Sequence, residues 1–306
     1  MSPVSALSYL GLSKEAIWGT PVIAAKWLPV KDMKPTDDIK MILDEGKRGI
    51  AAKDFGAYQG TKLSNLEYGG DFFPDVAPYF LLAVLGADAV TGVGPYTHVF
   101  GLGSSPPSLT LQDFFGHTQE RQYAGCRVSE VGLKFASDTG ALEWTAKLLG
   151  KASALVVKTT PTIGTTTPFL GWQAALSIAG AGVAGRLLAA EWSLKRTLKE
   201  VFGANNSQDP SAIYAGMVEV TGKMTFDMPD EVELLHYINN DQPAVSVTLT
   251  SGANSIAILT TKTAFEKATV DRSQEFVRVD AQTRGLYNAT DAGPAKITVV
   301  NSIATY

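Results

Sequence analysis

Three glycines, Gly180, Gly182 and Gly185, have the spacing most suggestive of chemistry in this chain. With the residues between them they match the G-x-G-x-x-G fingerprint, in which backbone amides at the start of a helix hold a pyrophosphate. An apolar run precedes them at residues 174–179, and helix-like spacing follows at 186–202. However, no β-α-β rhythm surrounds them, and no acid that could bind a ribose follows at 201–205. We therefore predict a glycine-rich hairpin turn, and keep a dinucleotide-binding oxidoreductase as the alternative function.

The other residue types that catalysis or metal binding would need are scattered. His98, His117 and His236 are far apart, and none has a metal-ligand spacing such as H-x-x-x-H. Cys126 is the single cysteine, so no disulfide can form within the chain, and we expect a small, partly buried apolar residue there. No G-x-S-x-G nucleophile motif is present. We therefore predict a protein that is not an enzyme, with no catalytic residues, no metal and no cofactor.

The composition is that of an ordinary folded protein. The chain has 306 residues, 45% hydrophobic and 18% charged, with a net charge of −4. This balance argues against a basic stripe that grips nucleic acid, and is compatible with a surface along which nucleic acid slides without sticking. The N-terminal segment lacks the basic start of a signal peptide, and the uncharged residues 169–185 are too short and too polar to span a membrane. We expect no membrane association.

Residues 217–228 have the clearest structural pattern, because apolar and polar side chains alternate with a period of two. Only a β-strand turns successive side chains to opposite faces, so we predict a long strand with one dry and one wet face. A turn-forming run precedes it at 205–211, and a short helix is predicted after Pro229. The dry face is Val218, Val220, Met224, Phe226 and Met228; the wet face is Glu219, Thr221, Lys223, Thr225 and Asp227.

The remaining pattern predicts a β-rich chain with one clear helix. That helix covers residues 76–85, with Asp71 as its cap and Gly86 at its end. We predict further strands at 108–115, 127–135, 141–149, 244–250, 255–260, 275–280 and 295–300, with a hairpin turn at 137–140. Residues 44–65 are predicted to be a long exposed loop or extended hairpin, of a length that is usually functional. A connector rich in threonine and proline at 158–168 separates two halves, and all five tryptophans are expected in the core.

The order of these segments resembles the tail tube proteins of tailed bacteriophages, of the siphovirus-like major tail tube type. The resemblance rests on the segment 189–230, read as AAEWSLKRTL, KEVFGANNSQDPSAIYAG and then MVEVTGKMTFDMPDEVEL, which continues into the start of a helix. It rests also on LSKEAIWGTPV, EGKRG and YQGTKLSNLEYGGDFFP in the first third. It changes one prediction. Residues 187–200 have helical spacing, but their counterpart in the family is a strand, in which Leu188, Ala190, Trp192 and Leu194 would face inward.

The resemblance implies a β-rich α+β fold, a β-sandwich or barrel with a flanking α-helix and a long exposed loop. It implies a single tail-tube-like domain over residues 1–306, and leaves open whether the strands after residue 244 form a small addition or complete the same sandwich. Six such subunits would close a ring, and rings would stack into the tube through which DNA leaves the capsid. The implied partners are further copies of the chain and the tape measure, terminator and distal tail proteins, with DNA as non-specific cargo. The implied location is the virion tail, assembled in the host cytoplasm.

Two sets of residues are candidates for assembly. Glu219, Lys223 and Asp227, on the wet face of the 217–228 strand, would line the lumen or face a neighbouring subunit, unless that face lies on the outer wall in open solvent. The long loop would join adjacent subunits or rings. Its candidate residues are Asp44, Glu45, Lys47, Arg48, Lys53, Asp54 and Tyr58. The alternative within the same class is another ring-forming protein of a tail or injection machine.

Overall fold

A computed structural model describes residues 4–116, 118–138, 140–183, 185–273 and 275–306. Within these residues the strands form two antiparallel sheets. The large sheet has twelve strands: β1 (Tyr9–Lys14), β2 (Lys26–Leu28), β3 (Asp32–Asp44), β4 (Gly56–Asp71), β7 (Leu109–Phe114), β8 (Gln119–Ala136), β9 (Glu143–Gly150), β10 (Ala154–Val157), β13 (Leu187–Val201), β14 (Ala212–Asp227), β17 (Thr263–Asp271) and β18 (Arg278–Gly285). The small sheet has seven: β5 (Gly86–Thr91), β6 (Tyr96–Leu102), β11 (Ala174–Ile178), β12 (Ala181–Gly182), β15 (Val245–Ser251), β16 (Asn254–Thr260) and β19 (Lys296–Asn301).

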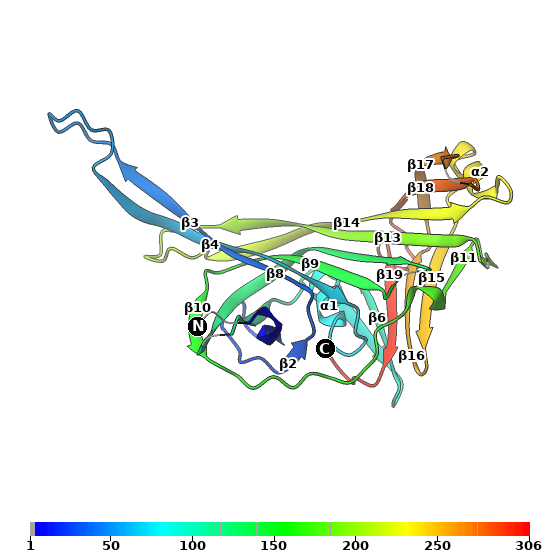
Figure 1. Cartoon of the computed structure of the whole chain (residues 1–306), viewed down its shortest axis with the longest axis horizontal. Coiled ribbons are helices and arrows are strands. Elements are labelled where there is room, and N and C mark those ends of the chain that lie inside the picture. Colours follow the sequence, from blue (N-terminus) through cyan, green and yellow to red (C-terminus); the bar gives the residue numbers. More distant parts are fainter. Residues whose placement is uncertain (1–3, 117, 139, 184, 274) are drawn as a thin grey trace.

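The helical elements are few and short. They are α1 (Pro78–Leu85), α2 (Val232–Ile238) and the 3₁₀ turns η1 (Ser5–Leu7) and η2 (Gly171–Gln173). The strands of the small sheet run across the direction of β8, β13 and β14, and α1 lies enclosed between the two sheets (Figure 1). This arrangement is the predicted β-rich sandwich, but the helix expected to flank the sandwich lies in its core.

Helix α1 is buried on every side, as its apolar sequence predicts. All eight of its residues are buried, and the Phe80 ring stacks on Trp144 of β9 with centroids 4.6 Å apart. The helix ends at Gly86, whose φ of 99° is left-handed, as predicted. The prediction that Asp71 caps the helix is wrong. Asp71 ends β4 and accepts a hydrogen bond from Lys31 at 2.6 Å, because residues 74–77 form a separate turn before the helix begins.

Strands β13 and β14 are neighbouring inner strands of the large sheet and confirm two predictions. The segment with helical spacing is the strand β13, because pairing with β8 and β14 on both sides outweighs helix propensity. On β14 the dry face is inward: Val220, Met224 and Phe226 are buried, while Val218 and Met228, just after the strand, are half-buried. Strand β14 begins five residues earlier than predicted, at Ala212.

Residues 44–65, predicted to be either a long exposed loop or an extended hairpin, belong to an extended hairpin. Strands β3 and β4 pair from Asp32↔Gly69 to Asp44↔Gly56 and project from the body as a two-stranded arm, here called the arm (Figure 1). Only residues 45–55 form its loop, and Asn65 lies inside β4. The turn between β13 and β14 contacts the arm, because Lys62 N–H donates to the Gln208 carbonyl at 2.8 Å and the Gln208 amide donates to the Gln59 carbonyl at 2.9 Å.

Several smaller predictions need correction. Trp172 is 71% exposed, so not all tryptophans lie in the core, although Trp144 and Trp192 do. The strand predicted at 275–280 begins at Arg278 and runs on to Gly285. Its partner β17 went unpredicted because a bulge beside Glu266 interrupts its alternation. Helix α2 begins at Val232. The turn predicted at 137–140 includes residue 139, which lies outside the described residues.

Candidate functional site

The glycine motif at 180–185 forms a hairpin, as predicted. Strands β11 and β12 pair through Ser177↔Gly182 and Ile178↔Ala181, with Ala179 and Gly180 at the turn. Both turn residues have left-handed backbone, with φ of 52° and 81°. After residue 184, which lies outside the described residues, the chain enters the strand β13. No helix N-terminus faces the described glycines, so the oxidoreductase alternative lacks the geometry on which it depends.

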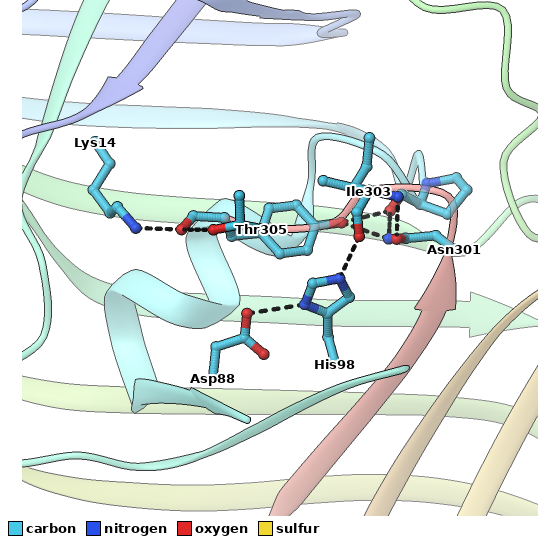
Figure 2. Close-up of polar contacts among 8 residues, drawn as sticks. Lys14, Asp88, His98, Asn301, Ile303 and Thr305 are labelled. Atoms are coloured by element: carbon cyan, nitrogen blue, oxygen red, sulfur yellow. Dashed lines mark hydrogen bonds and ion pairs between the residues drawn. The ribbon is translucent and has the colours of Figure 1, made fainter. Parts of the chain in front are cut away.

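His98 is a structural residue. It is fully buried, and its Nδ1 lies 2.9 Å from a carboxylate oxygen of Asp88 while its Nε2 lies 2.7 Å from the Ile303 carbonyl (Figure 2). The Ile303 carbonyl can only accept, so Nε2 of His98 donates to it, and Asp88 holds the other ring nitrogen. This contact fixes residues 302–306 against the core, where the Tyr306 ring packs edge-on against His98 with centroids 4.6 Å apart.

Among the described residues, the other candidate groups likewise form no reactive centre. His236 lies 3.4 Å from Asp241 near the surface, and His117 lies outside the described residues. Cys126 is fully buried, and burial raises the pKa of its thiol well above the ordinary value, which suppresses the reactive thiolate. In the described ranges, no group of three or more His, Cys, Asp or Glu side chains could hold a metal. Neither helix in the described part of the chain is long and apolar enough to cross a membrane.

The outer face of the large sheet, here called the charged face, is organised instead in rows that run across the strands. One row, here called the charge row, alternates strictly in sign over eight neighbouring strands. From β3 through β4, β9, β8, β13, β14 and β18 to β17 it is Lys34, Glu67, Lys147, Glu130, Lys195, Glu219, Arg284 and Glu266. Four cations and four anions make the row electroneutral.

Contacts along the charge row are direct. Lys34 lies 3.3 Å from Glu67, and Lys147 lies 3.0 Å from Glu130. Further along, Arg284 pairs with both Glu219 and Glu266. Exposed pairs of this kind stabilise a sheet only weakly, by about 0.2–1 kcal/mol each. The row therefore sets the character of the surface more than the stability of the fold.

Glu130 is the most enclosed member of the row. It accepts a hydrogen bond from Ser193 at 2.7 Å and lies between Lys147 and Lys195, whose ammonium is 3.8 Å away. Burial by itself would raise the pKa of Glu130, but these hydrogen bonds and cations outweigh it and lower the pKa below the ordinary value. The carboxylate is therefore charged at neutral pH, as the alternation requires.

A second charged row runs parallel to the first, separated from it by small residues. Its members are Asp71, Glu143, Lys134, Glu191, Lys223, Gln282 and Lys267, three anions and three cations around one amide. Between the rows lie Gly69, Thr145, Gly132, Ser193 and Thr221. Gly132 is required there, because a Cβ would lie 2.5 Å from Thr145 Oγ1. Hence each of the two rows carries balanced charge.

The structure brings the three predicted wet-face residues onto this one surface. Glu219 belongs to the charge row, Lys223 belongs to the second row, and Asp227 lies opposite Arg278 where β14 ends. Sequence reasoning missed their partners on other strands, chiefly Glu130 and Arg284. The alternation in residues 127–135 and 141–149 shows which side chains face outward, but no local signal reveals which of them lie opposite one another.

The seven arm residues gather at its far end, around the loop of residues 45–55. Asp44 pairs with Arg48, whose guanidinium lies 4.7 Å from the centre of the Phe55 ring, and Lys53 lies 3.1 Å from Glu45. Lys47 and Asp54 are exposed in the same loop. Tyr58 is 59% exposed on β4, and the apolar Met41, Ile42 and Leu43 are each about half exposed on β3. The arm thus presents apolar side chains that its own chain leaves uncovered.

The notable surfaces of this β-sandwich are two rows of balanced charge on one face, open sheet edges and a projecting arm with exposed apolar side chains. The family described as phage tail tube protein matches residues 5–304 of the chain. The chain belongs to this family, and it is accordingly a structural protein of the virion tail. A search of curated proteins returned no match.

Proposed function

We propose that this protein is the repeating subunit of the tail tube, that six copies close a ring, and that stacked rings form the conduit for DNA ejection. The observation that carries the proposal is the pair of electroneutral rows on the charged face. Double-stranded DNA carries about one negative charge per 1.7 Å, and clustered cations would bind it. On the charged face the cations alternate with carboxylates, so a lumen lined by Glu219, Lys223, Asp227 and their neighbours would offer passing DNA little net attraction.

Closure into a ring is supported by the sheet edges. An exposed strand edge is a template for uncontrolled pairing, and a closed ring removes it. Both sheets contain strands from before and after the 158–168 connector, which supports one domain over residues 1–306, including the strands after 244. Further copies of the chain are then the main partner, and the tape measure, terminator and distal tail proteins would meet the ends or lumen of the tube during assembly in the host cytoplasm.

Stacking of rings is assigned to the arm. A two-stranded ribbon is at best marginally stable in water, and Met41, Ile42 and Leu43 remain exposed on this one. A neighbouring ring that covers these side chains would stabilise the arm. Deleting residues 46–54 should leave folded subunits that cannot form long tubes. Tubes of normal length from this variant would contradict the assignment.

Negative-stain microscopy of the purified chain tests the proposal, with rings and tubes as the expected result. The lumen assignment is tested with Lys223→Cys, labelled by a bulky maleimide before and after assembly. Thr250→Cys, exposed on β15 of the small sheet, is the matched control, and Cys126 is buried and should not interfere. We expect assembly to block labelling at position 223 and not at 250. Equal labelling of both in assembled tubes would place the charged face on the outside.

A further inference from the structure

The large sheet has two free edges along its charged face, β3 and β17. In the part of the chain that the structure describes, β3 pairs only with β4, and β17 pairs only with β18. The path between them is β3-β4-β9-β8-β13-β14-β18-β17, in which every neighbouring pair is antiparallel. Because this path has eight strands, its two edge strands run in opposite directions. A head-to-tail join between two copies would therefore continue the antiparallel pattern, whereas an odd number of strands would force a parallel seam.

The two edges also have opposite charge where the charge row reaches them. The row begins with Lys34 on β3 and ends with Glu266 on β17. Inside the row Glu130 lies between two cations, Lys147 and Lys195. Glu266 has Arg284 on one side and the free edge on the other, and Lys34 has Glu67 on one side and the free edge on the other. Each end of the row thus has room for the charge that the opposite end supplies.

We propose that β17 of one subunit pairs with β3 of the next, with Glu266 beside Lys34 of the neighbour, so that the charge row continues around the ring. This inference rests on the proposed ring and names the surfaces that close it. The same register sets Lys262 beside Asp38, a second complementary pair of exposed residues. Pro35 on β3 lacks an N–H, which weakens pairing by the backbone alone and leaves more of the choice of register to the charges.

Charge reversal tests the seam. Glu266→Lys and Lys34→Glu each set like charges across every seam, and we expect each variant to need about tenfold more protein to assemble, an effect reduced by salt. In a 1:1 mixture of the two variants, each variant keeps the wild-type charge that the other lost. In an even-numbered ring in which the two variants alternate, every seam then sets a cation at one of the positions 34 and 266 beside an anion at the other. The mixture should therefore assemble nearly as wild type does. The double variant K34E/E266K should recover as well.

This rescue cannot arise within a subunit, because Lys34 and Glu266 lie at opposite ends of the eight-strand path and each reversal also harms its own neighbour, Glu67 or Arg284. Glu266→Gln is the conservative control, with an effect smaller than that of reversal. The melting temperature of each variant as a monomer shows whether it folds. Rings from wild-type protein with no rescue by mixing or by the double variant would overturn the seam and leave the proposed function standing. An absence of rings from wild-type protein would overturn both.

A cross-link supplies a second measurement that does not depend on charge. The register that sets Glu266 beside Lys34 sets Thr36 opposite Ala264 of the neighbour, both on the charged face. The double variant T36C/A264C should form a ladder of disulfide-linked multimers on oxidation of assembled protein, and neither single variant should do so. A double variant that assembles into rings and yields only monomers on a denaturing gel would contradict this register.

Discussion

The buried Asp113 and its half-buried neighbour Asp37 should respond to pH in opposite ways, and Asp113→Asn is the sharpest test. Asp113 on β7 and Asp37 on β3 line one cavity of about 490 Å³. Burial raises the pKa of Asp113 to about 6 from an ordinary value of 3.8, and the hydrogen bond from Tyr68 at 3.3 Å and the charge of Arg121 only partly oppose this. Between pH 3.8 and about 6, the folded state therefore holds a proton on Asp113 that the unfolded chain has already released.

The size of the effect follows from that difference. The pKa of Asp113 is about two units higher in the folded than in the unfolded chain, and at 1.36 kcal/mol per unit this difference gives about 3 kcal/mol of stability. That stability is fully present below pH 3.8 and is lost as the pH rises to about 6. Asparagine imitates the protonated acid and can still accept the Tyr68 hydrogen bond. Asp113→Asn should therefore be more stable than wild type at pH 7.5, by up to about 3 kcal/mol, and nearly equal to it at pH 4.

Asp37→Asn is the matched control with the opposite sign. Burial would raise the pKa of Asp37, but Ser153 and Ser64 donate hydrogen bonds at 2.6 Å and Arg121 lies 3.3 Å away, so its pKa is lowered. Its charge stabilises the fold above pH 3.8, and this contribution is lost as the pH falls through the lowered value. Asp37→Asn should destabilise the fold most at pH 7.5.

The assay for both variants is urea unfolding of dilute monomer followed by tryptophan fluorescence at several pH values. An Asp113→Asn variant less stable than wild type at pH 7.5, or shifted equally at every pH, would refute the reasoning.

Two further changes test how the core is closed. Gly86→Ala should lower the free energy of unfolding by about 1–3 kcal/mol, because φ is 99° and a Cβ would lie 2.9 Å from the Gly103 carbonyl oxygen, whereas Gly101→Ala, with open space around it, should change the urea midpoint far less. Tyr306→Ala should cost about 3–5 kcal/mol because its ring is buried against Tyr79, His98 and Phe100. Tyr306→Phe should cost about 1 kcal/mol, since only the hydroxyl contacts with Asn301 and Pro74 are lost. Equal losses from the two Tyr306 variants, or from the two glycine variants, would contradict these assignments.

Much of the local structure could be predicted from the sequence. Alternation alone separates Val220, Met224 and Phe226 from Glu219 and Lys223 on β14, and the buried faces agree. Gly86 marks the end of α1 for a reason that is also local, the left-handed backbone of its C-cap. Where local and tertiary preferences disagreed, as on β13, periodicity favoured a helix and only the family resemblance favoured the strand. Trp172 shows the converse, because an apolar neighbourhood in sequence does not ensure burial in space.

The sequence by itself determined which side chains of each predicted strand face water, because that choice depends on a period of two within a few residues. Only the tertiary structure decided that Lys34, Glu130, Glu219 and Glu266 lie in one row, and that β3 and β17 are its open ends. Register between distant strands depends on bulges, such as those beside Glu266 and within the β13–β14 pair, and on packing against α1. These are properties of the whole sheet, and a shift of one residue would place every charge of a strand on the opposite face.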